Sequence, residues 1–291
     1  MNGKQSLQKA IASLQSPAVV AFGNALLDVV VTIRGDELLE KYKLKGDNEI
    51  EHPEDVIQQI LADLPTDWDQ RVAPGGCAQN TARILQWLCG GSSIPPVVIF
   101  CGGIGNDSRG TTVEKMVKAA GVQTQYAVHP ELPTGIALSL SRDSSRSLIA
   151  NLGAAGVFTL LDLEKCNLPL ENLKIIYIEG FFLTHGLDVA KEIIKLTQDK
   201  SAIVAFNING EYMVEVSLIA ISKQPHHHLL GPCKPMEGIE RTIVCVGWRN
   251  SELLIVTAYY ISIFSTFIMQ TYNKHGFSEM LCSTLFKYNK K

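Results

Sequence analysis

The sequence lacks the features of a secreted or nucleic-acid-binding protein. Its cysteines are odd in number and scattered, and they form no C-x-x-C pair (residues 77, 89, 101, 166, 233, 245 and 282). This distribution argues against a disulfide framework or a cysteine-based zinc site and favours reduced thiols. Residues 1–15 hold no continuous apolar run, so we expect no signal peptide. The net charge of −3 provides no basic face, so we expect no nucleic-acid partner. These absences predict a cytoplasmic protein, with the nucleus as an alternative location.

Aspartate is missing from the last quarter of the chain. The final aspartate is Asp199, and residues 217–291 hold eight lysine and arginine residues against four glutamates, whereas the whole chain has a net charge of −3. We therefore separate residues 16–216 from a tail, 217–291, of different character. The consecutive histidines 226–228 cannot all face one ion, so we expect no metal site there.

Residues 253–269 form a nearly uncharged run within that tail. The run is at the short limit of a membrane span, about 17–25 residues. Its β-branched and aromatic content suits a buried strand or an aggregation-prone segment equally well. Between these interpretations we do not expect a membrane span.

Short apolar runs at 18–22, 97–101, 173–178 and 203–206 indicate buried strands, and helical patterns lie between them. This alternation is typical of an α/β fold with a doubly wound, mostly parallel sheet flanked by helices. Ligands of such sheets bind beyond the carboxyl ends of the strands. Because Asn24, Gly102-Gly103 and Gly180 follow predicted strands, we expect them to line one crevice.

We expect a small β lid whose strands lie near residues 26–34 and 134–150. Alternating apolar residues and a polar turn at 142–146 indicate a two-stranded antiparallel flap over 134–150 with one face in water. Asp28 lies among β-branched residues, where it either has a partner or points to water from an edge strand. Arg146 is either a solvated surface arginine or an anion contact.

The stretch Pro74-Gly75-Gly76-Cys77-Ala78-Gln79-Asn80 is the strongest candidate for a ligand contact. Two adjacent glycines let the backbone lie against a ligand, because no Cβ intervenes. A helix should follow, with Asn80 in its first turn and an apolar stripe of Ala82, Ile84, Leu85 and Leu88. A glycine loop before a helix N-terminus suits hydroxyls or phosphate, although it is also typical of an ordinary tight turn.

Six segments resemble, in order and spacing, the adenosine kinases of the ribokinase-like (PfkB) family of sugar and nucleoside kinases. They are GNALLDV (23–29), GGCAQN (75–80), GGIGNDSRG (102–110), PTG (133–135), RSLIANLGAA (146–155) and IEGFFLT (178–184). The resemblance covers residues 16–216 and implies the ribokinase-like fold, with a β lid that closes over the nucleoside. It also implies that the C-terminal part of this fold is missing or replaced after about residue 216.

The resemblance assigns a role to each residue that matches a motif. Asp28 would accept hydrogen bonds from the two ribose hydroxyls, as an acceptor-only carboxylate can. Arg146 would stabilise the charge of the transferred phosphoryl group. The remaining substrate-binding residues would be Asn24 and Asn80, which hydrogen-bond the nucleoside, Gly75 and Gly76 beneath the ribose, and Leu26, Leu148, Ala150 and Phe182 around the adenine.

The reaction implied is transfer of the γ-phosphoryl of Mg-ATP to the 5′-hydroxyl of adenosine, which gives AMP in purine salvage. The family places its general base, an aspartate, in a C-terminal G-x-G-D loop whose N–H groups form an anion hole. This sequence has no G-x-G-D and no aspartate after Asp199, and nothing after Phe206 matches the family's Asn-x-x-Glu segment. We therefore expect a monomeric chain with incomplete Mg²⁺ and ATP sites and weak or no transfer, or alternatively a non-catalytic nucleoside-binding or regulatory isoform.

Overall fold

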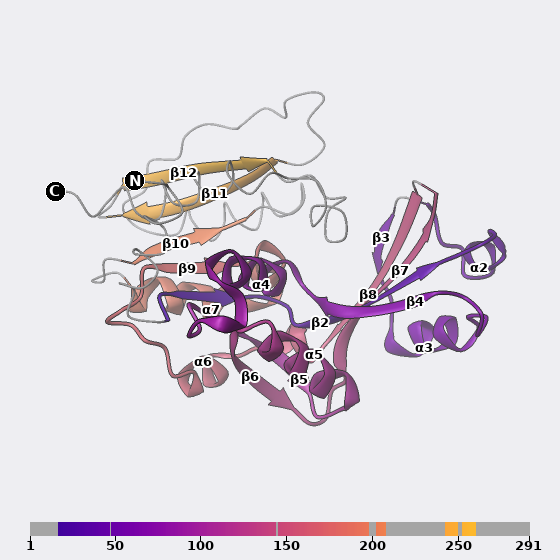
Figure 1. Cartoon of the computed structure of the whole chain (residues 1–291), viewed down its shortest axis with the longest axis horizontal. Helices are drawn as coiled ribbons and strands as arrows, with labels where there is room; N and C mark the ends of the chain where they lie inside the picture. Colours follow the sequence, from indigo (N-terminus) through magenta and orange to yellow (C-terminus); the bar gives the residue numbers. More distant parts are fainter. Residues whose placement is uncertain are drawn as a thin grey trace.

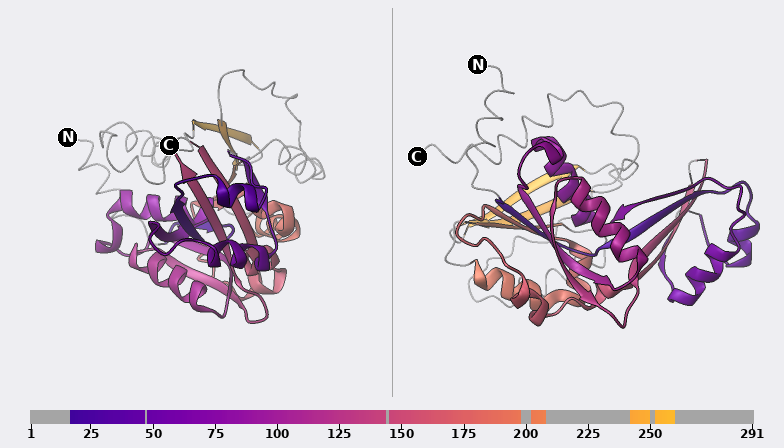
Figure 2. Two further views of the ribbon diagram at one scale, coloured as in Figure 1. Left: turned by 90° about the vertical axis from the view of Figure 1, so that its right-hand side faces the viewer. Right: turned by 60° about the horizontal axis from the view of Figure 1, so that its bottom comes forward.

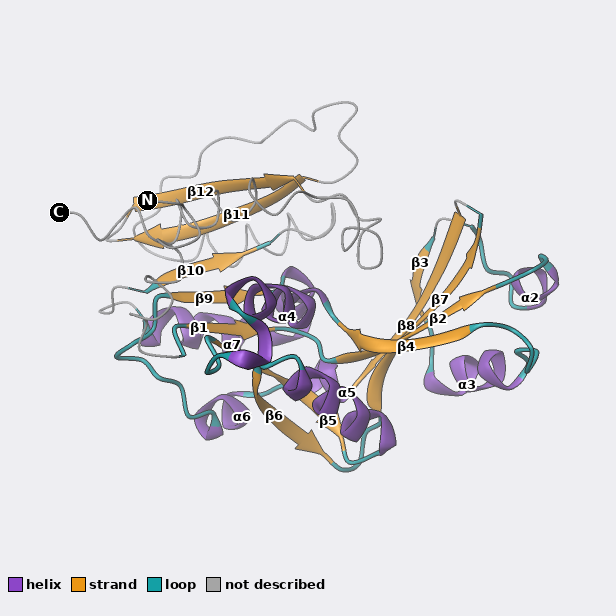
Figure 3. Ribbon diagram, viewed as in Figure 1, coloured by secondary structure: helices purple, strands orange, loops and turns teal. Residues whose placement is uncertain are grey.

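The computed structural model describes residues 17–46, 48–143, 145–197, 202–207, 242–249 and 252–259. The described strands form two sheets, one of seven strands and one of five (Figure 1). The smaller sheet projects from the larger one, as two further views make clear (Figure 2). The helices lie mainly around the large sheet, and two short helices lie at the far end of the small one (Figure 3).

The large sheet is parallel through five neighbouring strands. Their order is β10 (Ile203–Phe206), β9 (Ile175–Ile178), β1 (Val19–Phe22), β5 (Val98–Gly105) and β6 (Gln123–His129). The flanking helices are α4 (Cys77–Cys89), α5 (Ser108–Ala119), α6 (Leu160–Lys165) and α7 (Leu183–Leu196), with 3-10 turns η1 (Gly91–Ser93), η2 (Ala154–Val157) and η3 (Gly180–Phe182). The predicted α/β sheet is confirmed, and all four predicted apolar runs are strands. Strand β5 is longer than expected, so Gly102 and Gly103 lie within it and not beyond its end.

Two strands of the tail extend the large sheet. Strand β11 (Thr242–Arg249) pairs antiparallel with β10, and β12 (Glu252–Tyr259) pairs antiparallel with β11. The first part of the run 253–269 is therefore a strand, and the edge of β10 is paired. Residues 260–269 and the histidines 226–228 lie outside the described residues. Within the described ranges, no helix is both long and apolar enough to cross a membrane.

The small sheet, hereafter the lid sheet, has the order β3 (Glu49–Glu51), β8 (Ser145–Gly153), β7 (Thr134–Arg142), β2 (Leu26–Thr32) and β4 (Gln70–Gly75). Helices α2 (Glu37–Lys41) and α3 (Glu54–Ala62) accompany it. The predicted antiparallel hairpin of β7 and β8 is confirmed. However, β7 is the central strand, and Thr134 to Leu140 are all buried. The expected wet face is therefore wrong for this strand: Ile136, Leu138 and Leu140 enter the apolar core, and Ala137 and Ser139 on the other face are buried as well.

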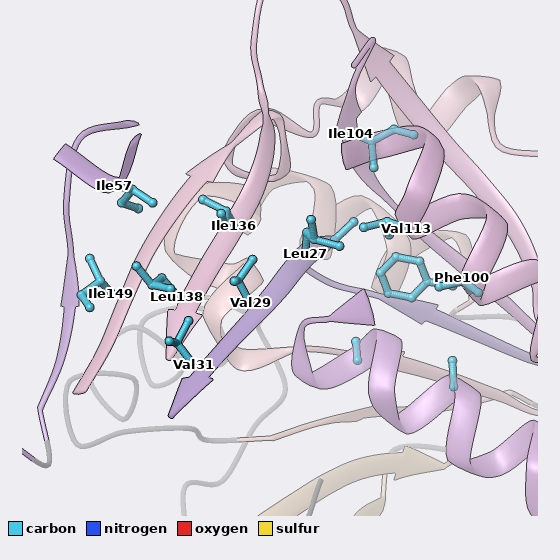
Figure 4. Close-up of a cluster of buried hydrophobic side chains, with 14 of the residues drawn as sticks. Leu27, Val29, Val31, Ile57, Phe100, Ile104, Val113, Ile136, Leu138 and Ile149 are labelled. Carbon is cyan, nitrogen blue, oxygen red and sulfur yellow. The ribbon is translucent and has the colours of Figure 1, made fainter. Parts of the chain in front are cut away.

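One apolar cluster joins the lid sheet to the large sheet. Figure 4 shows side chains of β2, β7, β8 and α3 converging with those of β5 and α5. Two lid strands contribute alternate residues to this cluster, namely Leu27, Val29 and Val31 from β2 and Ile136, Leu138 and Leu140 from β7, and β8 adds Ile149. Because side chains alternate across a strand, the residues between them must lie on the opposite face of the lid sheet.

Helix α4 begins after the glycine pair, as predicted, but its buried face differs from the predicted stripe. The buried residues of the helix are Ala78, Gln79, Ala82 and Gln86, which lie on one side, whereas Ile84 is 47% exposed. Two residues after Ala82, Ile84 lies on the other side of the helix, since neighbours on one face are three or four apart. Helix α5 is capped by Asp107, whose carboxylate accepts from the Gly110 N–H at 2.7 Å.

Candidate functional site

Five of the predicted site residues lie on one face of the lid sheet. Asp28 is in register with Ala137, and Ala137 with Ala150, so all three side chains share a face. Two-residue steps along the same strands add Leu26, Leu148 and Arg146 to that face. It is the face opposite the apolar cluster. The strand pairing therefore brings together residues that are more than a hundred positions apart in the sequence.

Asp28 lies against Gly75. A Cβ built on Gly75 would overlap the Asp28 carboxylate, so a residue with a side chain would displace it. Strand β2 runs between β7 and β4, and the Asp28 side chain is partly buried, so the edge-strand interpretation is wrong. Burial raises the pKa of Asp28 to about 6, while the positive charges of Arg146 and Arg83 oppose that rise.

Gly76 lies between Gly75, which contacts the Asp28 carboxylate, and the first residue of helix α4. It has φ of +90°, and a Cβ there would overlap the Asn24 carbonyl oxygen. The Asn80 N–H donates to the Gly76 carbonyl at 2.9 Å and so closes the first turn of the helix. The Asn80 side chain accepts from Arg83 Nη1 at 2.9 Å, and this nitrogen also donates to the Pro74 carbonyl at 3.2 Å. Asn80, Gly75 and Gly76 are thus held in one compact corner beside Asp28.

Asn24 is buried at the end of β1 and is held by two side chains. Its N–H donates to Glu179 Oε2 at 2.9 Å, and its Oδ1 is bonded to His185 Nε2 at 2.9 Å. Because an amide oxygen only accepts, Nε2 carries the proton. Burial lowers the pKa of His185 to about 4, so the ring is neutral near pH 7. The Asn24 amide group is left with its NH₂ directed away from His185.

Glu179 is a buried carboxylate that joins three elements. Besides Asn24, it accepts from the Cys77 N–H at 3.3 Å and the Ala78 N–H at 3.5 Å at the start of α4. Burial raises its pKa to about 7, and the three N–H donors oppose that rise. Asn24 and Gly180 lie near each other, because Glu179, which accepts from the Asn24 N–H, directly precedes Gly180; the crevice shared by Asn24, Gly102-Gly103 and Gly180 stays a prediction.

The sequence did not identify Arg83, Glu179 or His185. For Glu179 a signal existed, since it is a carboxylate at the carboxyl end of a predicted strand, the position at which ligands are expected. Arg83 lies three residues after Asn80 in a predicted helix, and this spacing, which places both on one side of the helix, could have identified it as a neighbour of the site. His185 had no such signal, because its contact with Asn24 spans 161 residues.

Phe182 is not where the predicted adenine wall would need it. Its side chain is fully buried in a second apolar cluster, formed by strands of the large sheet with helices α6 and α7. Its ring centroid lies 6.5 Å from that of Phe22, 5.8 Å from that of Phe158 and 5.3 Å from that of His185. The expected contact with a base is therefore corrected: Phe182 packs into the core.

Arg146 is an exposed residue of β8 next to the hairpin turn. It lies on the same lid face as Asp28, and its charge acts on that carboxylate. Among the residues that the structure describes, no group of three His, Cys, Asp or Glu side chains could hold a metal ion.

A seven-stranded sheet flanked by helices, with a β lid that carries a carboxylate over a glycine pair, defines a ribokinase-like α/β protein. Residues 61–213 match the pfkB family carbohydrate kinases, and the chain belongs to this family. Adenosine kinase 2 of Arabidopsis thaliana is 32% identical over 203 residues, which cover 68% of this chain and 56% of that protein. The adenosine kinase of Saccharomyces cerevisiae is 29% identical over 208 residues, 70% of this chain and 60% of that one.

Solved structures give the same result. Anopheles gambiae adenosine kinase in complex with P1,P4-di(adenosine-5) tetraphosphate superposes with a TM-score of 0.63 at 27% identity, over 72% of this chain and 62% of that one. Schistosoma mansoni adenosine kinase in complex with adenosine gives 0.61 at 26% identity, over 72% and 60%. This chain therefore matches little more than half of the length of the curated relatives named above.

Proposed function

We propose that this chain binds adenosine on the lid face defined above, with the ribose at Asp28. The observation that carries the proposal is the Asp28 carboxylate lying over Gly75, which has no Cβ. A carboxylate accepts two hydrogen bonds side by side, so it suits a pair of neighbouring hydroxyls. The glycine leaves room for a flat sugar ring close to the backbone.

The neighbouring residues support a nucleoside as the ligand. Leu26, Leu148 and Ala150 share the lid face with Asp28 and supply apolar surface for a base. Asn24 and Asn80 supply amide groups at the ends of the glycine pair. Relatives of this chain are named adenosine kinases, and one is solved with adenosine bound. Adenine as the base rests on that kinship together with the apolar lid residues.

The proposed reaction is transfer of the terminal phosphoryl of Mg-ATP to the 5′-hydroxyl of adenosine, which releases ADP and forms AMP. Arg146, at the lid hairpin, would offset charge on the transferred group. A base must take the hydroxyl proton, and the chain has no aspartate after Asp199 to match the family's base. Losing a general base costs roughly 10²–10⁴-fold in rate. We therefore propose that the chain binds adenosine but transfers the phosphoryl group weakly or not at all. We also propose that it is monomeric, that it is cytoplasmic or nuclear, and that it descends from an enzyme of purine salvage.

Calorimetric titration with adenosine tests the binding part. The wild-type chain should bind, and Asp28→Asn should bind at least about tenfold more weakly, because hydrogen bonds to a charged acceptor are lost. Asp55→Asn is the control, since Asp55 is an exposed carboxylate in the first turn of α3. Equal affinity of wild type and Asp28→Asn would refute the assignment of the ribose to Asp28.

The missing late aspartate favours a second candidate, a nucleoside-binding or regulatory isoform without catalysis. AMP formation from adenosine and Mg-ATP by the purified 291-residue chain distinguishes the two candidates. A rate near that of a full-length adenosine kinase would contradict weak transfer, whereas binding without turnover would favour the regulatory isoform.

A further inference from the structure

Gln79 is a fully buried polar residue inside the glycine motif, and the site described above gives it no role. Its Nε2 donates to the Gly75 carbonyl oxygen at 2.7 Å, and its exposed fraction is 0%. Its other end, Oε1, accepts a hydrogen bond from the Tyr126 hydroxyl on β6. A buried side chain with both ends hydrogen-bonded has one defined orientation.

The Tyr126 hydroxyl determines which end of the Gln79 amide faces Gly75. A hydroxyl that donates must meet the amide oxygen, so the NH₂ group is directed to the other side, toward the Gly75 carbonyl. The Tyr126 ring is itself held by an edge-on contact with Phe100, with ring centroids 5.7 Å apart. Burial raises the pKa of Tyr126, so its hydroxyl keeps the proton that it donates.

The orientation of the Gly75 carbonyl also sets the direction of the next N–H. In a trans peptide, the C=O and the N–H of one peptide plane point in opposite directions. Gln79 draws the Gly75 carbonyl inward, so the Gly76 N–H points outward, away from the buried face of α4. Both residues of this peptide are glycines, and Gly76 has φ of +90°, so local sterics restrict the orientation of the peptide plane little. Without Gln79, this peptide plane would be free to rotate.

We propose that Gln79 and Tyr126 are positioning residues that orient the Gly75–Gly76 peptide so that its N–H is presented to the sugar beside Asp28. This inference rests on the proposed function. A sugar hydroxyl both donates and accepts, so one hydroxyl can donate to Asp28 while its oxygen accepts from the Gly76 N–H. A ligand without that hydroxyl loses both bonds. The two buried residues would therefore support discrimination between ribose and deoxyribose.

Tyr126→Phe tests the proposal because it removes a single oxygen atom from a residue of β6, outside the lid face. Its affinity for adenosine should fall about 2- to 10-fold, as expected for one lost neutral hydrogen bond. The ratio of its affinity for adenosine to its affinity for the 2′- or 3′-deoxy analogue should also fall. Gln79→Met, which keeps the volume but has no donor for Gly75, should lose about tenfold or more and show the same reduced discrimination.

Tyr42→Phe is the matched control, since the Tyr42 hydroxyl also makes one hydrogen bond, to Asp63, beyond the lid sheet. It should leave affinity and discrimination unchanged, and thermal melts report the folding of each variant. The proposal is overturned if Tyr126→Phe binds as wild type does, or if it weakens adenosine and both deoxy analogues equally. Failure of the proposed function is distinct, because the wild-type chain would then show no Asp28-dependent binding of adenosine.

Discussion

The carboxylate of Asp28 fills the space that a side chain on Gly75 would need. The two residues lie on neighbouring strands, β2 and β4, which pair antiparallel. The glycine and the carboxylate are therefore a matched pair: one is small because the other occupies the space beside it. Changing either residue should therefore change the affinity of the site for the ribose of adenosine.

Gly75→Ala should weaken adenosine binding at least about tenfold, because the new methyl group displaces the carboxylate that holds the ribose. Calorimetry measures this effect. Gly156→Ala is the control. The nearest atom to a Cβ at that position is Leu152 Cβ at 3.3 Å, so the new methyl group would not meet Asp28. Unchanged affinity in Gly75→Ala would show that the position of the carboxylate is not needed.

Affinity for adenosine should rise as the pH rises through about 6, because Asp28 accepts both ribose hydroxyls only when it is charged. Titrations at pH 5 and pH 7 test this, and Asp28→Asn should abolish the dependence. The pH dependence of stability has the opposite sign. The folded pKa lies above the unfolded value of 3.8, so the folded state binds more protons between these values and loses stability as the pH rises through that window. The loss is about 3 kcal/mol at most, since each pKa unit corresponds to about 1.36 kcal/mol.

Glu179 should add a second stability slope, at higher pH. Its pKa is raised from 4.5 to about 7, so the folded state again binds more protons than the unfolded state, and stability falls as the pH rises between these values. Glu179→Gln should flatten this part of the profile in chemical denaturation. Glu179→Ala should lower the free energy of unfolding at pH 7 by about 1–3 kcal/mol, because the buried Asn24 N–H loses its acceptor. An identical slope in wild type and Glu179→Gln would contradict the assignment.

His185→Leu should weaken adenosine binding about 2- to 10-fold, because the Asn24 amide loses the donor that orients it. His185→Gln should restore most of the affinity, since a glutamine NH₂ can replace the Nε2–H. Asp188→Asn, an exposed change on the same helix, serves as the control. If the leucine and glutamine variants bind equally well, the bond to Asn24 does not contribute.

Most strands of the sheet core and of the lid hairpin could be predicted from local patterns. Residues 203–206 were predicted as a strand and are β10, and residues 18–22 contain β1. The β7–β8 hairpin followed from alternation and a polar turn. Strand β4 was missed because it contains Pro74 and Gly75, which have low strand propensity, and it forms through its pairing with β2.

The sequence by itself determined the family, the strand–helix alternation and the identity of Asp28, Asn24 and the glycine pair as candidates, because these are carried by motifs and short-range periodicity. Only the tertiary structure decided which way each side chain points. It buried Phe182 in the core, and it joined Glu179 and His185 to Asn24 and Tyr126 to Gln79. These contacts join residues between 47 and 161 positions apart, and no local pattern specifies a partner at that separation. Strand register and helix packing bring the partners within hydrogen-bonding distance, and both arise only when the chain folds.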